Sequence, residues 1–69
     1  MAVENREIYY QDEIFAASIH GTAQDAVKDF VDTITAEDEI VAPKPGSTIL
    51  VRERETGDDW FDEWFEVVV

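Results

Sequence analysis

The side chains that most often carry catalysis, histidine and cysteine, are scarce in this chain. His20 is the one histidine, and cysteine is absent, which excludes thiol catalysis, thiolate metal sites and disulfides. Ser18 lies two residues before His20 and on the same face of an expected strand. That spacing is about 6.5–7 Å, which is too long for a direct hydrogen bond. We therefore interpret His20 as a surface residue at a strand end and expect no nucleophilic triad around it.

Carboxylates are the abundant functional groups, with 17 aspartates and glutamates in 69 residues. Five of them lie close together near the C-terminal end: Asp58, Asp59, Asp62, Glu63 and Glu66. Oxygen ligands suit Ca²⁺ or Mg²⁺, but the spacing is not that of an EF-hand loop. Phosphate-binding loops, dinucleotide fingerprints and nucleophile elbows are absent as well. We expect diffuse cations at high salt, no specific metal site, no cofactor, no catalytic residue and no enzymatic activity.

The net charge of −12 narrows the classes of partner. Nucleic-acid phosphates and anionic membranes are bound by clustered lysine and arginine, and this chain has five such residues in all. Apolar runs stay well short of the roughly 18–20 residues of a membrane span, and no basic segment followed by an apolar one opens the chain. We expect a cytoplasmic protein that binds neither nucleic acid nor membranes directly.

A folded chain this acidic and this poor in lysine resembles the proteins of salt-loaded cytoplasms, such as those of halophilic archaea. Apolar residues make up 45% of the chain and aromatic residues 12%, more than a typical disordered chain contains. At molar salt the Debye length falls to about 3 Å, so surface carboxylates no longer repel one another at a distance. The resemblance implies a halophile-type protein whose fold depends on salt. The rival interpretation is an acidic regulator that mimics nucleic acid and occupies the nucleic-acid site of a basic protein.

The clearest periodic signal lies between Thr22 and Ala36. Apolar residues recur there at intervals of three and four and form one stripe on an α-helix: Ala23, Ala26, Val27, Phe30, Val31 and Ile34. Thr22 is placed to act as the N-cap, and Asp25 three residues on completes a variant of the capping box. We predict a helix that closes at Thr35 and Ala36, followed by an acidic connection over residues 37–39.

The segment before this helix is strand-like, and two interpretations of it stay open. Residues 6–19 form either a hairpin, with Gln11-Asp12-Glu13 as its turn, or one long strand with a bulge. We favour the hairpin, although the turn has no glycine to adopt a positive φ. Met1 to Asn5 is predicted to be a frayed lead-in.

Extended segments also follow the helix. Residues 40–42 form a short extended piece before the rigid turn at Pro43–Gly46, and strands are predicted over 48–54 and 60–69. Neither a linker nor a repeat divides the chain, so we expect one domain over residues 1–69. The predicted fold is α+β, a two-layer sandwich of one amphipathic helix packed on a mainly antiparallel sheet, in the order β-β-α-(short β)-β-β.

The two faces of this sheet are predicted to differ. The helix-covered face holds Ile8, Tyr10, Phe15, Ile19, Ile49, Val51, Phe65 and Val67, and the open face holds Tyr9, Leu50, Arg52, Arg54, Trp64 and Val68. On the open face the arginines are placed to stack on Trp64 or to pair with Glu66, and such residues are enriched at interfaces. We therefore predict a non-enzymatic protein-interaction module that uses the sheet face or the terminal strand edge. Its partner would be another protein or a second copy in a homodimer. A small-ligand or cation-binding accessory subunit is the remaining alternative.

Overall fold

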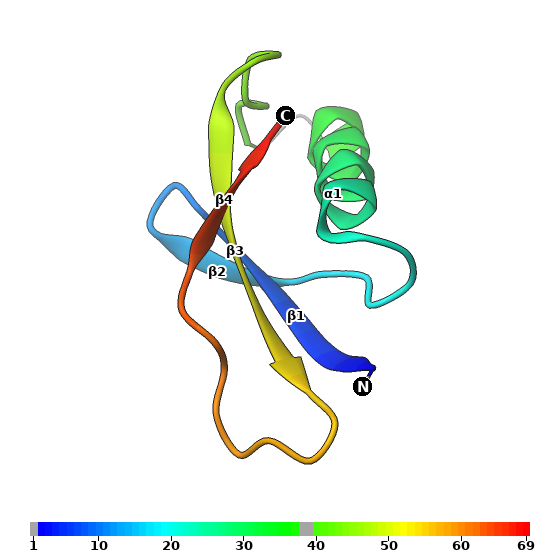
Figure 1. Cartoon of the computed structure of the whole chain (residues 1–69). Coiled ribbons are helices and arrows are strands. Elements are labelled where there is room, and N and C mark those ends of the chain that lie inside the picture. The colour runs from blue at the N-terminus through cyan, green and yellow to red at the C-terminus, as the bar shows by residue number, and fades with distance from the viewer. Residues whose placement is uncertain (1, 38–39) are drawn as a thin grey trace.

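The computed structural model describes residues 2–37 and 40–69 of the chain. Within these residues it consists of one helix and four strands: β1 (Val3–Tyr10), β2 (Glu13–Ala16), α1 (Ala23–Glu37), β3 (Thr48–Glu55) and β4 (Phe65–Val68). All neighbouring strands are antiparallel, and their order in the sheet is β2-β1-β3-β4. The helix lies beside the sheet, next to the C-terminal end of β4 (Figure 1). The predicted α+β fold is confirmed, with the element order β-β-α-β-β.

The segment before the helix is a tight hairpin rather than one bulged strand. β1 and β2 pair from Glu7↔Ala16 to Tyr10↔Glu13. Gln11 and Asp12 form the two-residue turn at φ values of 50° and 62°, which are the positive values that a type I′ turn requires. The Tyr9 hydroxyl donates a hydrogen bond to the Asp12 carboxylate (3.0 Å), and this bond raises the pKa of Tyr9.

The beginning of the chain is more ordered than the sequence predicts. β1 starts at Val3, inside the segment that we expected to be a frayed lead-in. Val3 pairs with Glu55 at the far end of β3, and Arg6 to Tyr9 continue the same ladder. β1 thus pairs with β3 from its first residue and with β2 from Glu7 onward, and local sequence patterns do not reveal this pairing.

α1 begins with the predicted capping box. The Asp25 N–H donates to Thr22 Oγ1 (3.2 Å), and the Thr22 N–H donates to Asp25 Oδ2 (2.9 Å). The Thr22 N–H favours the charged carboxylate and lowers the pKa of Asp25. The stabilisation from this carboxylate is therefore present above the ordinary carboxyl pKa and is lost as the pH falls through the lowered one. The helix continues to Glu37, and the rest of the predicted acidic connection lies outside the described residues.

The core lies between α1 and the sheet. Its buried apolar residues are Ile8, Ala26, Val27, Phe30, Ile34, Ile49 and Val51, and the half-buried Tyr10, Phe15, Phe65 and Val67 pack around them. The ring of Phe30 contacts those of Tyr10 and Phe15, with centroids 6.0 and 5.1 Å apart. The predicted helix-side set is thus confirmed except at Ile19. β2 ends at Ala16, so Ile19 lies in the connection to the helix and is 43% exposed.

Two of the extended segments after the helix differ from the prediction. Residues 40–42 form no strand and do not pair with the sheet. A side chain of the hairpin holds this segment instead, since the Tyr10 hydroxyl donates a hydrogen bond to the Val41 carbonyl. The strand predicted over residues 60–69 is confined to Phe65–Val68. The Asp62 N–H donates to the Glu53 carbonyl (2.9 Å), so the preceding loop folds back against the end of β3 before β4 begins.

Candidate interaction surfaces

Each arginine of the chain is paired with a glutamate inside the fold. The pairs are Arg6 with Glu53 (2.6 Å), Arg52 with Glu7 (2.6 Å) and Arg54 with Glu4 (3.0 Å). Pairing with Glu66 was the alternative to stacking on Trp64, and the arginines do not form it: their ion pairs among the described residues are with the three glutamates above. Lys28 and Lys44 are the basic residues for which residues 2–37 and 40–69 provide no ion pair. The surface left to a partner is therefore rich in carboxylates.

Arg6 is the buried member of this group, with 4% of its surface exposed. From β1 its guanidinium donates to the carbonyls of Ser18 (2.7 Å), Gly21 (3.3 Å) and Thr22 (3.3 Å), and its Nε donates to Glu53. The carbonyls belong to the connection that leads into α1, so Arg6 ties the start of the helix to the centre of the sheet. Its hydrogen-bonding groups are occupied, which indicates a structural role rather than a binding one.

The open sheet face brings together part of the predicted interaction set. Ile8 and Val51 are buried beneath the helix, so by alternation Tyr9, Leu50 and Arg52 lie on the opposite face. The Trp64 ring lies edge-on to that of Tyr9, with centroids 5.8 Å apart, and the Arg52 guanidinium lies 4.6 Å from the Trp64 ring centroid. The predicted stacking on Trp64 is therefore confirmed for Arg52, and Trp64 does not lie beneath the helix.

Arg54 and Val68 are the other two predicted residues. Arg54 reaches Asn5 and Glu4 on the neighbouring strand and the Asp58 carbonyl in the following loop. Val68 is 53% exposed at the end of β4. The described contacts thus join Tyr9, Arg52 and Trp64, and Arg54 has partners of its own on β1 and in the loop after β3.

Phe61 is the contact residue that the sequence reasoning missed. The Arg52 guanidinium lies 4.5 Å from the centroid of the Phe61 ring and 4.6 Å from that of Trp64, and its Nε donates a hydrogen bond to Glu7 (2.8 Å). We call these four residues and Tyr9 the Arg52 cluster. Phe61 was assigned to a strand, and the fold-back of its loop, which brings it here, has no local sequence signal. Because Arg52 is paired with Glu7 inside the cluster, the cluster offers a partner fewer unpaired charged groups than we expected.

β4 forms one edge of the sheet, and the side of it that faces away from β3 is unpaired within the described chain. The Val69 N–H donates to the Ser47 carbonyl (2.8 Å), so Val69 bonds toward the β3 side. Hydrogen bonding alternates along an antiparallel strand, which directs the N–H and C=O groups of Glu66 and Val68 to the open side. Such an edge is a template for another strand.

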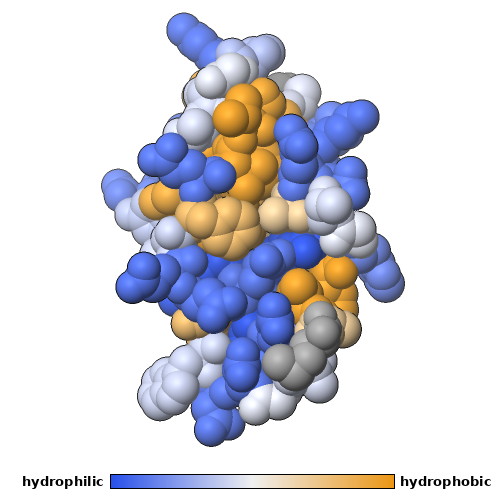
Figure 2. All heavy atoms as spheres, viewed as in Figure 1, coloured by the Kyte–Doolittle hydropathy of each residue, from blue (hydrophilic) through white to orange (hydrophobic). Residues whose placement is uncertain are grey.

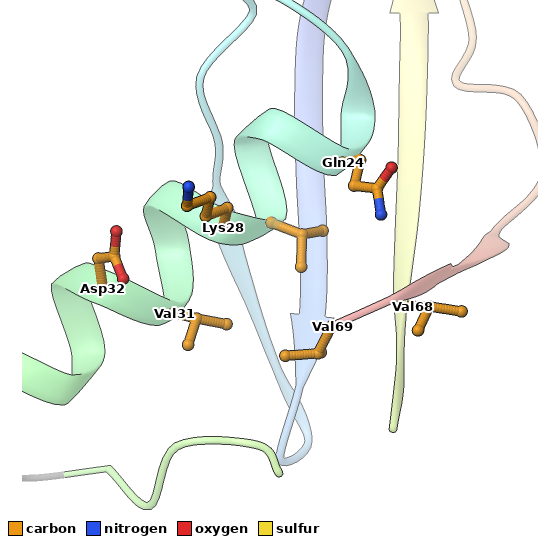
Figure 3. A pocket seen from close by; sticks show the side chains of 7 residues that line it. Gln24, Lys28, Val31, Asp32, Val68 and Val69 are labelled. Atoms are coloured by element: carbon orange, nitrogen blue, oxygen red, sulfur yellow. The ribbon is translucent and has the colours of Figure 1, made fainter. Parts of the chain in front are cut away.

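A groove of about 190 Å³ lies beside this edge. Figure 2 shows that apolar side chains gather over the region where α1 and β4 approach each other. Figure 3 shows the residues that line the groove: Gln24, Val27, Lys28, Val31 and Asp32 of the helix, with Val68 and Val69 of the C-terminal segment. Its volume is below the range of about 300–1,000 Å³ typical of small-molecule sites. It suits aliphatic side chains better than a cofactor.

Known protein families, curated proteins and solved structures were compared with this chain, and none matches. The function is therefore inferred from the geometry of the chain itself. Two surfaces enter that inference, the Arg52 cluster on the open face and the β4 edge with its groove. The β4 edge has backbone groups that lack a partner strand among the described residues, and this distinguishes it from the cluster.

The other candidate groups do not assemble into a site. His20 is exposed, and its backbone N–H, rather than its imidazole, meets the Ser18 hydroxyl (3.2 Å). Within residues 2–37 and 40–69, no three histidine, aspartate or glutamate side chains are placed to hold a metal ion. In the same part of the chain, no helix is long and apolar enough to cross a membrane.

Proposed function

We propose that this protein is a non-enzymatic interaction module that binds an extended segment of a protein partner as a fifth strand beside β4. The observation that carries the proposal is that the open backbone edge at Glu66 and Val68 lies beside an apolar groove. In strand addition, backbone hydrogen bonds supply affinity, and pockets for alternate side chains supply specificity. Every second side chain of the added strand would face α1 and enter the groove.

The charges around the groove define the chemistry of that segment. Lys28 and Asp32 balance each other in the lining, and Glu66 is the one charged residue of β4. The many carboxylates of the chain are thus not concentrated at the groove, and a strongly basic segment gains little there. A segment with small aliphatic side chains and no charge fits best, because it fills the groove without burying an unpaired charge.

Val68→Pro tests the proposal. The Val68 N–H faces away from β3, so proline removes a donor that an added strand needs without removing a hydrogen bond of the sheet. We expect an uncharged peptide of alternating threonine and valine to shift the amide NMR signals of Glu66 and Val68 in the natural protein. In the proline variant the affinity should fall at least about tenfold, since it loses a backbone hydrogen bond and the fit beside it.

Ile14→Pro is the matched control on the other edge strand. The pairing of Tyr10 with Glu13 beside the two-residue turn directs the Ile14 N–H to the open side of β2. This variant should bind the peptide as the natural protein does. Equal binding by the Val68→Pro variant would contradict the proposal. Binding of an arginine-rich peptide alone, weakening as salt rises, would instead favour an acidic regulator.

Dependence on salt is part of the same proposal. Three arginine–glutamate pairs leave most of the 17 carboxylates of a chain with net charge −12 to repel one another in dilute buffer. We expect the melting temperature, followed by circular dichroism, to rise between 0.1 and 2 M KCl. Relief of 2 kcal/mol of repulsion would raise it by about 10 °C for a chain of this size. Sucrose of equal osmolality is the control, and a melt unchanged by KCl would rule out a halophile-type protein.

A further inference from the structure

The open edge of β4 is complementary to itself. We infer that the strand added to β4 is that of a second copy of this chain, paired antiparallel about a two-fold axis at Val67. The inference rests on the proposed function, because it uses the same edge and the same groove. Such an interface is isologous, since each copy presents the same surface to the other.

The positions of the free backbone groups fix the register of this pair. Glu66 and Val68 carry the N–H and C=O groups that point away from β3. In one register all of these groups find partners: Glu66 of each copy exchanges two backbone hydrogen bonds with Val68 of the other copy. The axis then passes between the two Val67 residues, which lie opposite each other on the helix side of the sheet.

The charges of the edge favour this register. Glu66 would lie opposite a valine, so no two carboxylates face each other directly across the new ladder. The side-chain charges of Lys28 and Asp32 cancel in the lining of the groove. The β4 edge is therefore a place where two chains of net charge −12 can approach without opposing carboxylates. Repulsion between the rest of the two surfaces is screened at molar salt, so association should strengthen as salt rises.

The area that a dimer must bury requires the groove as well as the strand. Stable interfaces bury about 800 Å² on each partner, which is roughly a sixth of the 4875 Å² surface of this chain. Two paired strands of four residues bury less surface area than this on their own. In the proposed register, Val67 and Val69 of each copy face the helix side, next to the apolar lining of the other copy's groove. β2 also has an open side, but the groove lies beside β4, at the other edge of the sheet.

Val67→Cys tests the axis, because the chain has no cysteine and a disulfide must therefore join two chains. Opposed residues of a non-hydrogen-bonded pair have Cα atoms about 4.5 Å apart, which is within the range that a disulfide spans. In 2 M KCl with oxidised glutathione, we expect this variant to form a covalent dimer at least about tenfold faster than Ile14→Cys on β2, since pre-association raises the local thiol concentration.

Sedimentation of the natural protein supplies a measurement that does not depend on a variant. We expect its mass to rise from the monomer value of 7.9 kDa to twice that value between 0.1 and 2 M KCl, and the Val68→Pro variant to stay monomeric. A natural protein that is monomeric at all salt concentrations, or a dimer that weakens with salt, would overturn the inference. So would Val67→Cys cross-linking no faster than Ile14→Cys. If the threonine–valine peptide still binds a monomeric chain, the proposed function stands and the inference alone fails; if it does not bind, both fail.

Discussion

Replacing Arg6 with methionine should lower the free energy of unfolding by about 3 kcal/mol, because it leaves the partly buried Glu53 carboxylate without its cation. The three carbonyls of the connection into α1 lose their donors at the same time, and the helix start is no longer fixed to β1. For a chain of this size such a loss lowers the melting temperature by about 15 °C. Urea unfolding at 2 M KCl, followed by circular dichroism, measures it.

Arg54→Met is the matched control for Arg6→Met. It removes a similar pair, but one whose side chains are 22% and 48% exposed, and exposed pairs contribute at most about 1 kcal/mol. The difference between the two variants therefore measures what the buried contacts of Arg6 contribute beyond those of an exposed arginine. Similar losses in both would mean that Arg6 does not tie the helix to the sheet in the way that its contacts indicate.

Gly21→Ala should also destabilise the fold strongly, with an expected loss of about 2–3 kcal/mol. Gly21 has a φ of +72°, which side-chain-bearing residues adopt at a cost of about 1–2 kcal/mol. An added Cβ would also lie 2.6 Å from Asp25 Oδ2, the oxygen that caps the Thr22 N–H, so the capping box must open. Loss of a cap costs about a further 1 kcal/mol. Thermal unfolding of the purified variants measures the sum.

Gly57→Ala separates the two causes. Gly57 has a φ of +93° and nothing within 4 Å of its expected Cβ, so it bears the backbone cost alone. A second check is the pair Gly21→Ala and Asp25→Ala, whose losses should sum to more than that of the double variant, because removal of the carboxylate relieves the clash. Equal losses at Gly21 and Gly57 would show that the contact with Asp25 has no energetic effect.

Sequence reasoning was most successful where the signals are local. The stripe from Ala23 to Ile34 and the Thr22–Asp25 capping box depend on residues one helical turn apart, and both are confirmed. The alternation over residues 48–54 likewise identified β3, which runs from Thr48 to Glu55, and its buried face. These patterns are sufficient for the α+β class because a helix with one apolar stripe and strands with one apolar face have few ways to cover each other.

The errors concern contacts between residues far apart in the chain. Arg6 was assigned no role, because its partner Glu53 lies 47 residues away and the loop carbonyls that it binds have no signature. The loop around Phe61 was predicted as strand, since its aromatic residues have high strand propensity, yet one hydrogen bond from Asp62 to β3 directs it back across the sheet. Neither contact could be deduced from spacing.

The candidate interaction surfaces could also be predicted only in part. Alternation placed Tyr9, Arg52 and Trp64 on one face, and the structure brings them together. The sequence does not show that Glu7 neutralises Arg52 there. The terminal strand edge was named, but the groove beside it was not, because that groove depends on how α1 is placed relative to β4.

The order β2-β1-β3-β4 has a consequence for the synthesis of this protein. The central ladder joins Val3 to Glu55, so residues 1–55 must leave the ribosome before β1 can pair with β3 along its full length. Until then the nascent chain has only the β1–β2 hairpin and the α1 segment, neither of which has the sheet to cover its apolar side chains. Formation of the sheet should therefore wait until β3 has been synthesised, and a message truncated before the codon for Thr48 would yield a product that cannot form this sheet.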